Sequence, residues 1–173
     1  MIDLHIHSTC SDGTFTPKEI TDKVIEKNLY GFSLTDHDTV DGISEILSMN
    51  LPEHLKFIPG IEISCDALHR EIHILGYGID CKNQQLNKTL NDLRKKRMQR
   101  NLDMIDLFQK DGYPVTLEKL QHGDPDTVIT RAHFSRVLVE EGICTSRDQA
   151  FSKYLGEKCK YYIPKTFFDP KDC

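Results

Sequence analysis

Residues 3–12 read Asp-Leu-His-Ile-His-Ser-Thr-Cys-Ser-Asp, and this stretch decides how the rest of the chain is interpreted. His5 and His7 are two residues apart in a segment that is predicted to be a strand, so both imidazoles leave the same face of it. A turn rich in Ser, Thr and Gly then returns a carboxylate, Asp12, to the same edge. Paired imidazoles with an oxygen ligand at the end of a buried strand suit a divalent metal ion.

Three further apolar strands each carry one side chain of the same kind at or near the carboxyl end, namely His37, Glu62 and His73. Sites gather at this end of the strands in parallel α/β folds. Glu62 lies between two isoleucines, and a buried carboxylate needs a cation or a proton to offset its desolvation. Each residue alone fits a core histidine or a structural ion pair, but four such strands in succession favour a metal site.

The number of candidate ligands indicates more than one metal ion. The set consists of imidazoles and carboxylates: His5, His7, Asp12, His37, Glu62 and His73. One tetrahedral ion cannot use them all, so two or three divalent ions are predicted. The mixed ligands suit Mn²⁺, Fe²⁺ or Zn²⁺ better than Mg²⁺ alone. Clustered metals of this kind are typical of phosphate ester hydrolysis.

Composition excludes several other classes of protein. The chain has 173 residues, 38% of them hydrophobic, which suits a globular protein with one core. Its net charge of −5 gives no reason to expect duplex DNA binding. It has no apolar run of the roughly 18 residues that a membrane helix needs, and the N-terminus enters a strand at once. Six cysteines without Cys-x-x-Cys spacing are read as reduced thiols, so we expect a cytoplasmic protein and no membrane partner.

Residues 1–80 alternate strands and helices, which is typical of a parallel α/β fold. Thr16-Pro17-Lys18-Glu19 predicts a helix start, with Thr16 as the cap, Pro17 in the first turn and Glu19 completing a capping box. This helix should reach about Asn28. Strands are expected at 2–6, from residue 31, at 57–63 and at 71–77, with a second helix from Thr39 or Asp41 to Leu51.

From residue 81 the pattern becomes helical and polar. Helices are predicted at 83–111, 116–122, 131–141 and 146–155. We therefore expect a first half of the fold with the metal ligands at 1–80, an inserted helical lobe at 81–160, and a return toward the first half at 161–173.

The lobe carries a group of cations in an otherwise acidic protein, from Arg94 through Arg97 to Arg100. A solvated helix face explains most of them, but Arg97 and Arg100 are three residues apart, share a face and could contact a phosphate. Arg131 and His133 begin a predicted helix whose free N–H groups favour anions. These four residues are the candidate substrate contacts.

Taken together, five motifs resemble the PHP (polymerase and histidinol phosphatase) family: His-x-His, Ser-Asp-Gly-Thr, Thr-Asp-His-Asp, Pro-Gly-Ile-Glu-Ile-Ser and Ile-His-Ile-Leu-Gly-Tyr. The resemblance is to its bacterial metal-dependent phosphoesterases and runs from Met1 to about Pro164. It implies the N-terminal part of a distorted (β/α)7 barrel with an inserted helical lobe and up to three metals. His5 and His7 would hold one ion, Glu62 would bridge it to a second one bound by His73, and Asp12 with His37 would hold the third.

By this resemblance the protein is expected to hydrolyse phosphate esters of small nucleotides, such as nucleoside 3′,5′-bisphosphates or short RNA ends. Arg131 and His133 match an Arg-x-His that lies near the substrate phosphate in this branch. Histidinol phosphate is the alternative substrate. A non-catalytic, metal-binding regulatory module is the alternative function.

The resemblance stops with the chain, before the Ala-His-Pro strand and the late Asp-x-His segment that supply the family's remaining ligands. Asp169-Pro170-Lys171-Asp172 reads as the start of a helix that ends at Cys173. We therefore expect an N-terminal portion of a longer protein. An open sheet edge in such a portion could pair with another chain, so an oligomer is possible.

Overall fold

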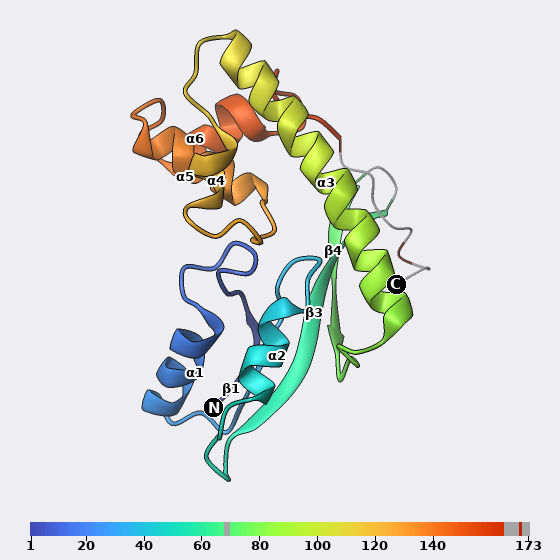
Figure 1. Ribbon diagram of the computed structural model, residues 1–173. Helices are drawn as coiled ribbons and strands as arrows, with labels where there is room; N and C mark the ends of the chain where they lie inside the picture. The colour runs from blue at the N-terminus through green and yellow to red at the C-terminus, as the bar shows by residue number, and fades with distance from the viewer. Residues whose placement is uncertain (68–69, 165–169, 171–173) are drawn as a thin grey trace. The chain divides into compact units, whose positions relative to one another are not determined.

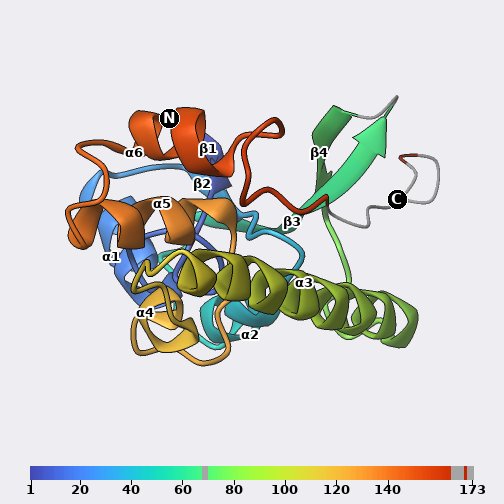
Figure 2. The same ribbon diagram turned by 90° about the horizontal axis from the view of Figure 1, so that it is seen from above.

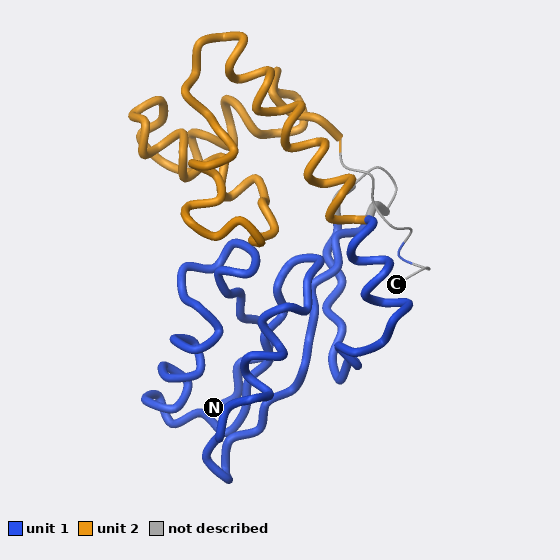
Figure 3. The backbone as a smooth tube through the Cα atoms, viewed as in Figure 1, with its two compact units in different colours: residues 1–92, 167–173 blue, residues 93–166 orange. Residues whose placement is uncertain are grey.

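The computed structural model describes residues 1–67, 70–164 and 170, with side chains described outside residues 66–71 (Figure 1). The chain divides into two compact units, of which the first contains Met1–Asp92 and the second Leu93–Thr166 (Figure 3). Within the described residues, all strands belong to the first unit. The predicted helix start at 169–172 lies outside the described residues except for Pro170.

The first unit is a four-stranded sheet with two helices, which confirms the α/β fold class (Figure 1). The sheet order is β1-β2-β3-β4, and β1, β2 and β3 are parallel. Helices α1 and α2 are the connections that parallel pairing requires. The elements are β1 (Ile2–Ile6), α1 (Pro17–Glu26), β2 (Gly31–Leu34), α2 (Asp41–Leu47), β3 (Lys56–Ala67) and β4 (Arg70–Tyr77).

Strand β4 departs from the predicted parallel pattern, because it pairs antiparallel with β3. Only two residues separate Ala67 from Arg70, whereas a crossover between parallel strands needs about a dozen. The gap between the predicted strands was already too short for a crossover. As a result Glu62 and His73 lie inside the β3–β4 ladder, where Ser64 pairs with His73, and not at two carboxyl ends.

The start of α1 confirms the predicted capping box. The backbone N–H of Glu19 donates to Thr16 Oγ1 at 3.2 Å, and the Thr16 N–H donates to the Glu19 carboxylate at 2.8 Å. Pro17 occupies the first turn, where its missing N–H costs nothing. Helix α2 is capped differently, since Val40 precedes it without a side-chain cap and the Asp41 N–H donates to Thr39 Oγ1 at 3.2 Å.

Helices α1 and α2 contribute to the core on one side of the sheet. Phe32 and Leu34 of β2 pack with Ile20 and Val24 of α1 and with Ile46 of α2. Because side chains alternate along a strand, Ser33, which lies between Phe32 and Leu34, faces the other side of the sheet. On β1, Ile6 packs against this core, so the same alternation directs His5 to the other side of the sheet.

The second unit is helical in its described residues. Helix α3 (Gln84–Lys110) matches the predicted 83–111 helix within one residue at each end, and it begins in the first unit. Among the shorter helices, α5 contacts both α4 and α6 (Figures 1 and 2). Their bounds are α4 (Leu117–Gln121), α5 (Arg131–Glu140) and α6 (Arg147–Ala150), and a π-helical turn (Phe151–Leu155) follows.

The core of the second unit is aromatic. The ring of Phe108 stacks on that of Tyr161 with 4.1 Å between centroids, and Phe134 and Tyr154 pack around them. Of the helices that the structure describes, none combines the length and the apolar character that crossing a bilayer requires.

Candidate metal centre

The first unit brings together all six side chains that the sequence singled out as metal ligands. They form three overlapping groups, and within each group one ligand atom per residue lies within 4.8 Å of the others. The groups are His5, His7 and Glu62; His37, Glu62 and His73; and His7, Asp12 and His37. Of the residues that occur in two groups, only the Glu62 carboxylate has two oxygens with which to bridge two ions, because a neutral imidazole has one acceptor nitrogen.

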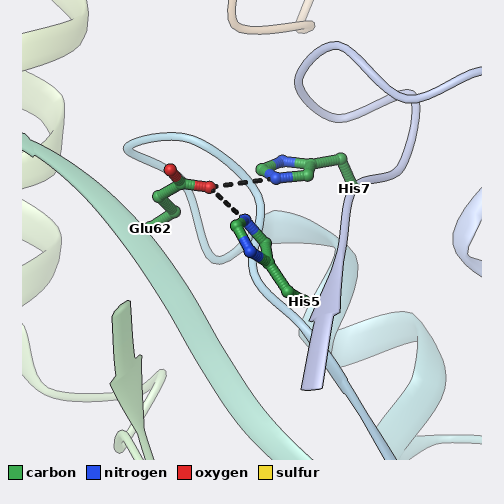
Figure 4. A group of neighbouring side chains, drawn as sticks. All are labelled: His5, His7 and Glu62. Carbon is green, nitrogen blue, oxygen red and sulfur yellow. Dashed lines mark hydrogen bonds and ion pairs between the residues drawn. The ribbon is translucent and has the colours of Figure 1, made fainter. Parts of the chain in front are cut away.

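Glu62 occupies the centre of the cluster. Its Oε2 lies 2.7 Å from His5 Nε2 and 3.0 Å from His7 Nε2, as Figure 4 shows. Its Oε1 lies 2.7 Å from His73 Nδ1. The two carboxylate oxygens therefore face different imidazoles, which is the arrangement of a carboxylate that bridges two ions.

Asp12 and His37 are spaced more widely. His37 Nε2 lies 3.6 Å from Asp12 Oδ2, and His7 Nδ1 lies 3.6 Å from Asp12 Oδ1. Two ligands of one tetrahedral ion, each about 2.1 Å from it, lie roughly 3.4 Å apart. In addition, His37 Nδ1 is buried and makes no hydrogen bond to the residues that the structure describes. An imidazole nitrogen of this kind fits a metal ion as its partner.

The backbone explains why the four imidazoles meet. His5 and His7 follow one another on the same side at the end of β1, with ring centroids 5.1 Å apart. His37 forms an isolated parallel bridge with Glu62 on β3, which places its ring 4.6 Å from that of His7 and 4.8 Å from that of His73. The four rings therefore follow one another with 4.6–5.1 Å between centroids, and Glu62 contacts three of them.

Burial and hydrogen bonding set the charge of the two central ligands. Burial raises the pKa of Glu62, but hydrogen bonds from His7, His73 and His5 outweigh it, so the pKa lies well below its ordinary value. Burial lowers the pKa of His37 to about 4, against opposing effects of Asp12 and Glu62. Near neutral pH Glu62 is therefore ionised and His37 neutral, as metal ligation requires.

His7 behaves differently from His37. Burial lowers its pKa, but the hydrogen bond with Glu62 and the nearby carboxylates of Asp12 and Asp36 outweigh this, so its pKa lies above the ordinary value. A metal ion at His7 has to displace that proton.

Sequence reasoning missed a layer of buried groups around the ligands. Asp36 and Asp38, on either side of His37, are 3% and 2% exposed and accept hydrogen bonds from serines. The available signal was their position, since two acidic residues flank a ligand in a buried segment. Gly13 belongs to the same layer, because a Cβ there would lie 2.0 Å from the carbonyl oxygen of His7.

The four candidate substrate contacts lie in the second unit and differ from one another. Arg97 lines a cavity of about 260 Å³ together with Arg94, Lys95 and the loop at 125–129. Arg100 is only 6% exposed, and its Nε donates to the carbonyl oxygen of Ile163 at 2.7 Å. Although Arg97 and Arg100 are three residues apart, the structure thus gives them different surroundings.

Arg131 and His133 both take part in the packing of the second unit. The Arg131 guanidinium lies 5.8 Å from the ring centroid of Phe151 and 5.6 Å from that of Tyr162. The Thr130 N–H donates to His133 Nδ1 at 3.0 Å and completes a capping box at the start of α5. Each side chain therefore has a role in the fold, and contact with a substrate stays a prediction.

A mixed α/β sheet that gathers imidazoles and carboxylates at one place provides the ligands of a metal centre. More narrowly, the PHP domain matches residues 3–162, and the chain belongs to this family. The family resemblance of the motifs is thereby confirmed.

Known relatives extend the comparison. The chain is 36% identical to the 5′-3′ exoribonuclease Rnm of Escherichia coli (strain K12), over 94% of this chain and 56% of that protein. It is 32% identical to a 3′,5′-nucleoside bisphosphate phosphatase of Chromobacterium violaceum, over 89% of this chain and 54% of that protein. A solved amidohydrolase structure from Chromobacterium violaceum, with bound sulfate and no metal, superposes with a TM-score of 0.88 at 30% identity, over 99% of this chain and 61% of that one. The chain spans a little over half the length of these relatives.

Proposed function

We propose that this chain forms the metal-binding part of a metal-dependent phosphoesterase that acts on small nucleotides, either nucleoside 3′,5′-bisphosphates or short RNA ends. The observation that carries the proposal is the position of Glu62, whose two oxygens contact separate imidazoles at 2.7–3.0 Å. The names of the relatives favour nucleotide and RNA substrates over histidinol phosphate.

We propose the same ligands that the sequence singled out, and their distances support this choice. His5 and His7 hold one ion, Glu62 bridges it to a second ion bound by His73, and Asp12 with His37 holds a third. Imidazole and carboxylate donors suit Mn²⁺, Fe²⁺ or Zn²⁺. Bound divalent ions supply an activated water and neutralise charge on the phosphoryl oxygens.

The chain's own residues prepare this chemistry. Ionised Glu62 offers one oxygen to each side, and neutral His37 offers a free lone pair at neutral pH. Among the cations of the second unit, we propose Arg97 as the main contact to a substrate phosphate, because it lines a cavity with two other cations. Arg100, Arg131 and His133 are proposed as secondary contacts.

The proposal is tested with the full-length protein. After dialysis against a chelator, Mn²⁺ should restore release of inorganic phosphate from adenosine 3′,5′-bisphosphate. Glu62→Gln should abolish that release, whereas Asp22→Asn, on the exposed side of α1, should not. Metal binding without phosphate release from nucleotides or RNA ends would overturn the proposal in favour of a non-catalytic, metal-binding module.

A further inference from the structure

The two acidic residues beside His37 are buried but belong to none of the ligand groups found among the described residues. We propose that both are positioning residues and that each holds a different part of the metal centre. Asp36 fixes the turn that carries Asp12, and Asp38 fixes the strand that carries Glu62. This inference rests on the proposed metal centre and identifies the groups that set its geometry.

Asp36 binds the turn after β1 with both of its oxygens. Its Oδ1 accepts from the Ser8 N–H at 2.7 Å and from the Ser11 hydroxyl at 2.6 Å, and its Oδ2 accepts from the Ser8 hydroxyl at 2.6 Å. Ser8 and Ser11 are 0% and 1% exposed. All three hydrogen bonds are short and have Asp36 as their acceptor, so they fix this turn firmly.

The turn held by Asp36 lies between two ligands. His7 precedes Ser8, and Asp12 follows Ser11 directly. The turn is also closed by its backbone, because the N–H groups of Ser11 and Gly13 both donate to the carbonyl oxygen of Ser8. A displacement of Ser11 therefore moves Asp12 more directly than any other ligand.

Asp38 also accepts hydrogen bonds with both of its oxygens, but its donors belong to Ser64 on β3. Its Oδ1 accepts from the Ser64 N–H at 2.9 Å, and its Oδ2 accepts from the Ser64 hydroxyl at 3.2 Å. Ser64 is two residues after Glu62, on the same face of the strand. Asp38 adopts a φ of +51°, which is unfavourable for a residue with a side chain and persists only where surrounding contacts fix it.

The backbone joins the two contacts through His37. The Glu62 N–H donates to the carbonyl oxygen of Asp36 at 3.2 Å, and the Asp38 N–H donates to that of Glu62 at 3.0 Å. His37 is thus held next to Glu62. The Asp36 carboxylate contacts the turn after β1, and the Asp38 carboxylate contacts β3. Groups of this kind, which orient metal ligands without touching the ion, typically change metal affinity roughly 10–100-fold when removed.

The test compares metal binding by folded variants. Mn²⁺ content after dialysis is measured by mass spectrometry, and affinity by titration calorimetry. Asp36→Ala should lose the same ion as Asp12→Ala, with that site weakened roughly 10–100-fold, while Asp38→Ala should reproduce the broader loss that we expect for Glu62→Ala. Asp22→Ala, an exposed aspartate on α1, serves as the matched control and should bind metal like the wild type.

Two milder variants keep the test decisive if the alanine variants do not fold. Ser11→Ala removes one of the donors to Asp36, and Ser64→Ala removes the hydroxyl donor to Asp38 but keeps the backbone donor. Lower melting temperatures with unchanged metal content would show that the acids are only structural and would overturn the inference, as would equal losses at all sites in both variants. A wild-type protein that binds no metal would instead overturn the proposed function itself.

Discussion

The two units differ in how well the sequence alone predicts the role of a polar side chain. In the first unit, the predicted ligands come from four strands and the turns after them, and all six converge. In the second unit, the predicted substrate contacts lie on or near helices, and three of the four have a role in packing or capping. A polar residue within an apolar strand has few explanations, whereas a cation on a polar helix has many.

The cost of placement explains this difference. A histidine or glutamate in a buried strand loses its solvation, so its presence there needs a specific partner. An arginine on a helix buries its apolar stem and contacts rings or carbonyl oxygens at little cost. A histidine or glutamate in a buried strand therefore indicates a functional site. A cation on a helix is equally consistent with a functional site and with packing.

The largest expected effect tests the metal ligands of the first unit. Glu62→Gln replaces an oxygen that faces imidazoles with an amide nitrogen, so both ions that share Glu62 should be lost. Phosphate release should fall at least about 10³-fold, corresponding to about 4 kcal/mol of lost charge stabilisation. The measurement is turnover of adenosine 3′,5′-bisphosphate with saturating Mn²⁺. Turnover within about tenfold of wild type would remove the bridging role.

The next effect tests whether any cation of the second unit serves a substrate. Arg97→Ala should lower nucleotide turnover roughly 10²-fold, because a charge-assisted contact to phosphate is lost. Turnover of p-nitrophenyl phosphate, which offers only the reacting phosphate, should hardly change. Exposed Arg147 provides the matched control. Equal losses on both substrates would assign Arg97 to structure.

A smaller effect should separate Arg100 from Arg97. Arg100 is buried and donates to Ile163, so Arg100→Ala should lower the free energy of unfolding by about 2 kcal/mol, the cost of a charged hydrogen bond. Arg97→Ala should lower it by less than about half of that, as for a partly exposed residue. Urea denaturation measures both. The reverse order of stabilities would contradict these assignments.

The smallest effect concerns pH. Because burial lowers the pKa of His37 to about 4, from an ordinary value of 6.5, the unfolded chain binds a proton in this interval that the folded protein does not. Metal-free protein should therefore lose stability through His37 as pH falls from 6.5 to 4. His7 acts in the opposite direction, since its raised pKa gives a contribution that is present below 6.5 and lost as pH rises through the raised value.

Denaturation of metal-free wild type and His37→Gln across this range compares the protein with and without the His37 imidazole, while His7 is present in both. The wild type should show the steeper fall in stability toward acid pH. Parallel stability curves would indicate that His37 is protonated equally in the folded and unfolded states.

Local signals predicted most of the fold. The capping box at Thr16, the strand and helix order and the extent of α3 follow from turn chemistry and periodicity. The direction of β4 did not, because the parallel expectation considered the order of elements and overlooked the short link before Arg70. Direction is set by the length of the connection, which the sequence also contains.

Sequence predicted the candidate ligands of the site but not the residues around them. Ligand residues stand out because their side chains are unusual in apolar strands, so His37 and Glu62 were found. Asp36 and Asp38 were not, because a carboxylate that accepts hydrogen bonds from serines looks in sequence like any polar turn. The roles of Arg131 and His133 depend on rings and caps that only tertiary structure brings together.

The position of the candidate ligands in the sequence determines when they are synthesised. The candidate ligands end at His73 and the described sheet ends at Tyr77, before the second unit begins at Leu93. Ribosomes make the N-terminal residues first, at roughly 5–20 residues per second, so several seconds separate synthesis of the sheet from that of the last helices. The nascent chain therefore carries the six candidate ligands of the first unit before the cations of the second unit exist, and ion binding is available to help the sheet fold during translation.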